Sequence, residues 1–113
     1  MDKLVLYQGA IISFLKEYAS IPNAVPTGDV KENLIIDTEN NHFQLLSVGW
    51  QKNKFIFAPI LHFDIVDGKV WIQQNNTEVF VADELMARGI AKDDIVLGFQ
   101  APIVRPHTGF AVA

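Results

Sequence analysis

The 113-residue sequence predicts a single α+β domain, in which an N-terminal helix precedes an antiparallel meander of about four strands, a second helix and a short C-terminal strand. Three observations predict this class. Apolar residues recur at helical spacing near the N-terminus, an Asp-Gly turn joins two apolar-rich runs in mid-chain, and a second helical pattern follows them. The chain is long enough to bury one hydrophobic core, so we expect residues 1–113 to form one domain.

The first helix is expected from Lys3 to Ala19, with Asp2 as its N-cap. Apolar residues at steps of three and four form a stripe along it, namely Leu4, Tyr7, Ile11, Phe14, Leu15 and Tyr18. Further apolar residues widen the stripe, so we expect the helix to be covered extensively. Two prolines and a glycine in residues 20–30 predict a loop that leads into the sheet.

Two strands are expected over residues 32–38 and 42–50, joined by a tight turn at Asn40-Asn41. A second turn at Lys52-Asn53 leads into a long strand that contains Pro59. Proline cannot donate to a β-ladder, so this strand either lies at the edge of the sheet or carries a bulge that bends it.

The central hairpin carries the clearest turn signal in the chain, Asp67-Gly68. This dipeptide suits a type I′ turn, because both central residues need positive φ. The turn sets a register in which directly paired residues share a face of the sheet. The expected pairs are Val66 with Lys69, Ile65 with Val70, Asp64 with Trp71, Phe63 with Ile72, and His62 with Gln73.

This register separates an apolar face of the hairpin from a polar one. The face expected in the core carries Leu61, Phe63, Ile65, Val70 and Ile72. The opposite face carries His62, Asp64, Lys69, Trp71 and Gln73. The polar face is therefore the first candidate for a functional surface.

After Asn75 the pattern becomes helical again. Thr77 is expected to cap a helix from Glu78 to Arg88, and Gly89 suits its C-terminal end. Residues 95–99 are short and apolar, which fits an extended segment or a helix end. The apolar residues 110–113 are expected either to add a strand at the edge of the sheet or to contact another subunit.

Composition and charge exclude several classes of function. The nine basic residues are scattered and the net charge is −4, whereas DNA-binding proteins usually cluster their cations, so direct DNA binding is not expected. The absence of cysteine excludes disulfides and thiolate metal sites. No apolar run approaches the roughly 20 residues of a membrane-spanning helix, and the N-terminus does not have the pattern of a signal peptide. We therefore expect a soluble, cytoplasmic protein.

Candidate catalytic chemistry centres on His62 and Asp64, which lie two residues apart and so share a strand face. Such a pair can ligate a metal or form a base with its orienting carboxylate. A metal site needs three or four ligands, however, and the other histidines are His42 and His107. A cross-strand polar network near Trp71 is favoured instead, and we expect no metal and no cofactor.

The serines do not favour nucleophilic catalysis, because Ser13, Ser20 and Ser47 all lie outside a nucleophile-elbow motif. We therefore assign no catalytic residue. Core packing is the ordinary role of both Trp50 and Trp71.

Two residues leave alternatives open. Because Trp71 shares its face with His62 and Asp64, it is alternatively the anchor of a protein interface. Arg105 either forms a structural salt bridge or binds a partner's carboxylate.

Three stretches of the sequence are distinctive, namely HFQLLSVGW (42–50), HFDIVDGKVWIQQNNTE (62–78) and ADELMARGIAKDDIVLGFQAPIVRPHTGFAVA (82–113). Together they resemble the XisI family, the fdxN element excision controlling factor proteins of cyanobacteria. The most specific part runs from Asp67-Gly68-Lys69 to Thr77-Glu78. A small departure is Asn75-Asn76, where an acidic residue is common before the threonine in the family.

The resemblance implies a part in programmed DNA rearrangement, the excision of an element that interrupts a nitrogen-fixation operon during heterocyst differentiation. In such systems the recombination chemistry belongs to a separate site-specific recombinase, and XisI-like proteins act with a companion, XisH. The resemblance supplies no catalytic residues. We therefore expect a non-enzymatic regulatory protein that contacts an XisH-like partner or a second copy of itself. The candidate interface comprises His62, Asp64, Trp71, Gln73, Arg105 and Phe110.

Two other functions stay open from the residues alone. One is a small metal-dependent or nuclease-related hydrolase that uses His62 and Asp64. The other is a DNA-binding accessory factor, which the scattered cations do not predict.

Overall fold

The computed structural model describes residues 2–21 and 29–113. Part of the predicted loop, residues 22–28, lies outside the described residues. The helices, strands and 3₁₀ turns are, in chain order, α1 (Lys3–Ala19), β1 (Lys31–Asp37), β2 (His42–Gln51), β3 (Lys54–Val66), β4 (Lys69–Asn75), α2 (Val81–Ala87), η1 (Lys92–Asp94), β5 (Ile95–Leu97) and η2 (Arg105–His107). The predicted α+β class, with its four-stranded meander and short C-terminal strand, is confirmed.

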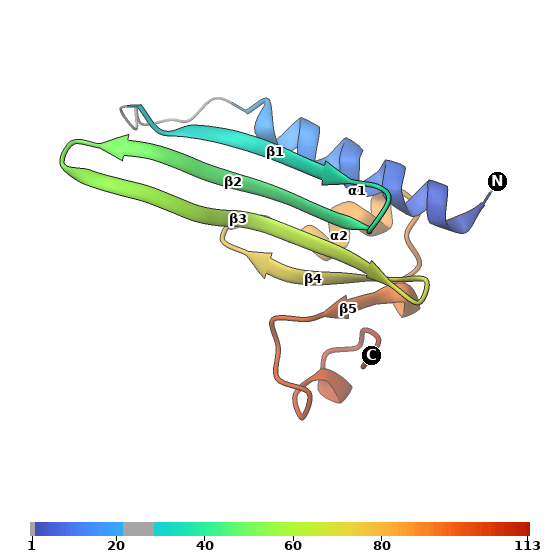
Figure 1. Cartoon of the computed structure of the whole chain (residues 1–113). Helices are drawn as coiled ribbons and strands as arrows, with labels where there is room; N and C mark the ends of the chain where they lie inside the picture. The colour runs from blue at the N-terminus through green and yellow to red at the C-terminus, as the bar shows by residue number, and fades with distance from the viewer. Residues whose placement is uncertain (1, 22–28) are drawn as a thin grey trace.

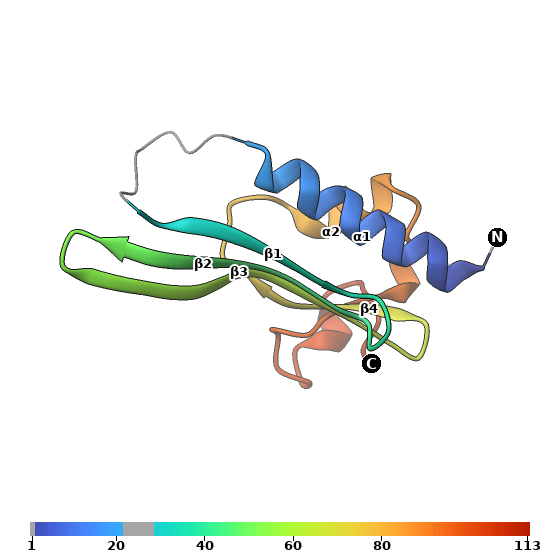
Figure 2. The same ribbon diagram turned by 45° about the horizontal axis from the view of Figure 1, so that its top comes forward.

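The five strands form one sheet in the order β1-β2-β3-β4-β5. The first four are antiparallel neighbours, whereas β5 runs parallel to β4. Both helices lie on one face of this sheet (Figure 1). The segment that follows β5 lies toward the opposite face, beside β4 (Figure 2). The distal part of the β2–β3 hairpin extends beyond both helices.

The hydrophobic core lies between the helices and the sheet. From α1 it takes most of the apolar stripe that the sequence predicts, including Ile11, Phe14 and Leu15, whereas Leu4 at the start of the stripe is exposed. From the central hairpin it takes the whole predicted core face, that is, Leu61, Phe63, Ile65, Val70 and Ile72. Helix α1 is covered on one side only, because a single sheet and α2 contact it. The expectation of extensive coverage was wrong, since Val5 on the outer side is exposed.

The start of α1 is fixed as the sequence predicts. The Asp2 carboxylate accepts a hydrogen bond from the Leu4 backbone N–H at 3.1 Å. An N-cap of this kind satisfies one of the amide groups that the first helical turn leaves without a partner.

The turns of the sheet place non-glycine residues at positive φ. Asp67 has a φ of 50° and Gly68 a φ of 77°, as the predicted type I′ turn requires. Asn41 and Lys52 also have positive φ, at the two other predicted turns.

The central hairpin keeps four of its five predicted pairs. The fifth was wrong, because His62 pairs with Gln74 and not with Gln73. A β-bulge in β4 leaves Gln73 as the extra residue. A second irregularity leaves Ile60 unpaired in β3, next to Pro59. Pro59 thus lies beside a bulge, in the part of β3 that pairs with β2 and not with β4, so both of its predicted roles apply.

The second helix starts three residues later than the sequence predicts, at Val81 and not at Glu78. Thr77 is not its cap. The Thr77 N–H and hydroxyl donate to the Asn75 side chain, and the Thr77 hydroxyl oxygen accepts from the Val79 N–H. These local bonds compete with the first helical turn. At the other end Gly89, at a φ of 100°, closes the helix as expected.

The C-terminal segment returns to the edge of the sheet. The Ala111 N–H donates to the Ile95 carbonyl at 2.9 Å, and Ala111 forms an isolated parallel bridge with Val96. The apolar end thus extends the sheet edge, one of its two predicted roles. Within residues 2–21 and 29–113, no helix is both long enough and apolar enough to cross a membrane.

Candidate functional site on the open face of the sheet

The open face, the side of the sheet away from α1 and α2, carries an aromatic patch made by Trp50, Phe55 and Phe57. Trp50 pairs with Phe55 in the β2–β3 ladder, and their ring centroids are 5.1 Å apart. The three side chains are 54%, 50% and 66% exposed, respectively. The expectation that Trp50 packs in the core was wrong. Its strand extends past both helices (Figure 2), so the core does not reach it.

Toward the opposite end of the β2–β3 ladder, on the same face, lies a His–Asp cluster formed by His42, His62 and Asp64. One oxygen of Asp64, Oδ1, lies 2.7 Å from His42 Nδ1 and 2.8 Å from His62 Nε2. His42 pairs directly with Asp64 across β2 and β3, and His62 lies two residues before Asp64. The cluster therefore follows from strand register.

Two amide side chains surround this cluster. Gln44 Nε2 lies 3.1 Å from His62 Nδ1, and Gln73 Nε2 donates to Asp64 Oδ2 at 3.3 Å. Gln73 reaches Asp64 even though the bulge removes it from the strand pairing. The cross-strand polar network that the sequence predicts is thus present, with Gln73 as a member.

The contacts within the cluster shift the pKa values of His42 and Asp64. The hydrogen bond to Asp64 raises the pKa of His42 above its ordinary value. Burial raises the pKa of Asp64, but hydrogen bonds from His42 and His62 outweigh it, so the net pKa is lowered. The pair is accordingly held toward imidazolium and carboxylate.

Trp71 and Arg105 contact each other on the open face. The Arg105 guanidinium lies 4.9 Å from the centroid of the Trp71 ring. Arg105 also donates through Nε to the Gln100 carbonyl at 3.1 Å, and through Nη2 to the Gly98 carbonyl at 3.4 Å. Arg105 thus holds the C-terminal segment against β4, and it covers part of the ring of Trp71.

Phe110 lies apart from the His–Asp cluster. It packs against the core and lines an apolar groove of about 240 Å³ together with residues of β4, α2 and β5. The Lys92 ammonium lies 5.3 Å from its ring centroid. Beside it in the groove, Phe80 is 81% exposed and Phe99 is 50% exposed.

The structure therefore brings His62, Asp64 and Gln73 together, places Trp71 with Arg105, and leaves Phe110 on the helical side of the sheet edge. Sequence reasoning missed His42, Gln44 and the aromatic patch. The signal for His42 was the turn at Lys52-Asn53, from which the β2–β3 register can be counted. That count also needs the bulge at Ile60, which shifts the pairing by one residue.

Comparisons with known proteins agree on one family. The profile of the family described as "XisI protein" matches residues 1–112. The solved structure of a XisI-like protein from Anabaena variabilis ATCC 29413 is 47% identical, with a TM-score of 0.89, covering 97% of this chain and 99% of that chain. The structure of fdxN element excision controlling factor XisI from the same organism is 37% identical, with a TM-score of 0.87, covering 99% of this chain and 100% of that chain.

The comparison with functionally curated proteins found no significant match. The profile match and the two similar structures nonetheless cover nearly the whole chain, and they show that this chain belongs to the XisI family.

Proposed function

We propose that this chain is a non-enzymatic accessory protein in the controlled excision of a DNA element, and that it works by contacting an XisH-like protein. A separate site-specific recombinase performs the DNA chemistry. Support for the setting comes from the similar structure described as an fdxN element excision controlling factor. Family membership over residues 1–112 supports carrying this setting to the whole chain.

The observation that carries the proposal is the exposed aromatic patch at Trp50, Phe55 and Phe57. Large exposed apolar patches mark interaction sites, and aromatic residues are enriched in the centres of protein interfaces. Nothing in the core requires these three aromatic residues, because the distal part of their hairpin extends past both helices.

The proposed contact surface continues from the aromatic patch across the open face. The His–Asp cluster and Gln73 lie farther along the sheet, beyond the Leu46–Pro59 pair, and Trp71 with Arg105 lies beside them on β4. A polar rim beside an aromatic centre is the usual composition of such a surface. Phe110 belongs to the neighbouring groove, which offers a second apolar contact at the sheet edge.

The hydrolase alternative has less support. A hydrolase needs a cleft that holds substrate beside its catalytic groups. Two cavities within residues 2–21 and 29–113, of about 240 and 310 Å³, are lined by other residues, and neither includes His62 or Asp64. The net charge of −4 likewise gives no support to direct DNA binding.

The test is co-expression of the tagged chain with an XisH-like protein, followed by co-purification. We expect the partner to be retained by the wild-type chain and lost with Phe57→Ser. Phe57 is 66% exposed, so its substitution leaves folding intact, which circular dichroism checks.

Phe80→Ser is the matched control, since it removes an aromatic ring of similar exposure from the other side of the sheet. Retention of the partner by Phe80→Ser supports docking on the open face. Loss with Phe80→Ser and retention with Phe57→Ser would instead place the contact at the groove. Recovery of the chain alone would remove the support for a partner contact.

A further inference from the structure

The His–Asp cluster has the composition of a metal site. His42, His62 and Asp64 each offer one ligand atom, and these atoms all lie within 4.8 Å of one another. Imidazole nitrogen and carboxylate oxygen are ligands that Zn²⁺ and similar divalent ions accept. Zinc sites with three protein ligands and a fourth position open to solvent are well known.

We propose that His42, His62 and Asp64 bind a divalent transition-metal ion of the zinc class on the open face. The inference concerns ion binding alone and does not rest on the proposed partner contact.

The three side chains can reach an ion by rotating, without a change in the strands that carry them. Ligands at zinc distances in a tetrahedron lie about 3.3 Å from one another. The two imidazole nitrogens now lie 2.7 and 2.8 Å from Asp64 Oδ1. These two contacts must lengthen by about half an ångström, and the two imidazole nitrogens, which lie within 4.8 Å of each other, must reach the same spacing, which side-chain rotation supplies. The His42 side chain is 58% exposed and has room to turn.

The backbone and the neighbouring amides prepare the site. The ligands project from two adjacent strands whose register fixes their spacing. Gln73 holds Asp64 Oδ2, which leaves Oδ1 facing both histidines. Gln44 lies 3.1 Å from His62 Nδ1. When His62 Nε2 binds an ion, His62 Nδ1 carries the ring proton. The Gln44 amide can then rotate so that its oxygen accepts a hydrogen bond from this N–H.

The full-length chain, free of affinity tags and stripped with a chelator, is titrated with Zn²⁺ in a calorimeter. We expect saturable binding of one ion per chain. Loss of a ligand in His42→Gln or Asp64→Asn is expected to abolish that binding or weaken it at least tenfold. Gln73→Ala, which removes only a supporting bond, is expected to weaken it by about 10–100-fold.

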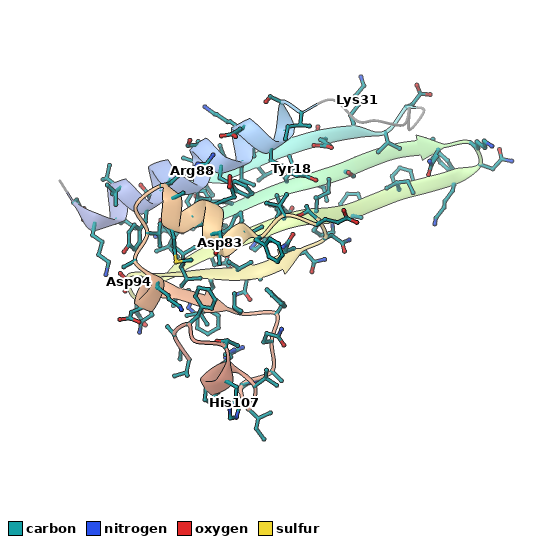
Figure 3. The ribbon with its side chains drawn as sticks, turned by 180° about the vertical axis from the view of Figure 1, so that it is seen from behind. Tyr18, Lys31, Asp83, Arg88, Asp94 and His107 are labelled. Carbon is teal, nitrogen blue, oxygen red and sulfur yellow. The ribbon has the colours of Figure 1, made fainter. Side chains whose placement is uncertain are left out.

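His107→Gln is the matched control, because His107 is an exposed histidine on η2 in the C-terminal segment (Figure 3). It should bind Zn²⁺ as the wild type does. A second readout is the visible spectrum of bound Co²⁺, whose intensity reports a tetrahedral site. If Asp64→Asn fails to fold, His42→Gln remains informative, since its side chain is largely exposed.

Absence of one-to-one binding overturns the proposal. So does binding that His42→Gln leaves unchanged, or binding that His107→Gln abolishes. These outcomes are separate from the partner experiment, because the ion titration contains no XisH-like protein.

Discussion

At the scale of single residues, Asp94 connects the first helix to the edge of the sheet. One oxygen of its carboxylate accepts from the Tyr7 hydroxyl at 2.6 Å and lies 2.9 Å from the Lys3 ammonium. Figure 3 shows Asp94 at the end of the molecule where α1 begins. The hydrogen bond from Tyr7, with that from Lys3, holds the pKa of Asp94 below its ordinary value.

Asp94→Asn should lower the free energy of unfolding by about 1 kcal/mol at neutral pH, because it removes the charge from a partly buried hydrogen bond. A depressed pKa stabilises the folded state above the ordinary value of 3.8. The difference in free energy of unfolding between wild type and Asp94→Asn should therefore be constant near neutral pH. It should vanish as the pH falls through the pKa that Asp94 has in the folded protein.

Urea unfolding at several pH values measures this difference. Asp93→Asn is the control, because the neighbouring Asp93 is exposed and should change stability little. A difference that persists unchanged as the pH is taken down through the folded pKa, well under 3.8, would mean that the charge of Asp94 is not what stabilises the contact.

At the scale of elements, the turn between β4 and α2 depends on one side chain. Asn75 accepts from the Thr77 N–H and hydroxyl, and its amide donates to the Val79 carbonyl. Asn75→Ala removes all three bonds and should cost about 1–2 kcal/mol of stability. Thermal unfolding measures the loss. Asn76→Ala, at an exposed neighbour, should stay within about 0.5 kcal/mol of wild type.

Gly9 and Gly89 should respond to alanine with opposite signs. A Cβ at Gly9 in α1 meets no atom within 4 Å, so Gly9→Ala should stabilise the protein by about 0.5–1 kcal/mol. Gly89 has a φ of 100°, so Gly89→Ala should destabilise it by about 1 kcal/mol. Denaturant midpoints compare the two. A loss of stability in Gly9→Ala would mean that this position is packed in solution.

The elements show where sequence reasoning succeeds. Patterns that are local, such as the Asp2 cap, the stripe of α1 and the Asp67-Gly68 turn, predicted the correct structure because a few neighbouring residues determine them. The bulge at Gln73 and the late start of α2 were not predicted. The late start of α2 reflects side-chain bonds that compete with the first helical turn, and the bulge adds one unpaired residue to a ladder. The periodic spacing of apolar residues predicts neither.

The candidate site was predictable in part for the same reason. One hairpin with a clear turn carries His62, Asp64 and Gln73, so counting residues from the turn predicts that they lie close together. His42 comes from the neighbouring hairpin, whose register is shifted by the bulge at Ile60. The exposure of Trp50 depends on where the helices end relative to the sheet, which is a property of the assembled fold.

At the scale of the whole molecule, the two faces of the sheet carry different sets of side chains. The helices and one face of the sheet form the core, while the other face carries the aromatic patch and the His–Asp cluster. Substitutions at Phe57 should therefore leave folding intact, whereas those at Phe63 should unfold the protein.

Light scattering on the co-expressed pair tests the central claim most directly, because it gives the mass of whatever the chain binds. The chain alone has a mass of 12.6 kDa. We predict a species whose mass includes the XisH-like partner, and which Phe57→Ser reduces to the separate components. A mass equal to 12.6 kDa or its multiples, with no partner included, would contradict the account.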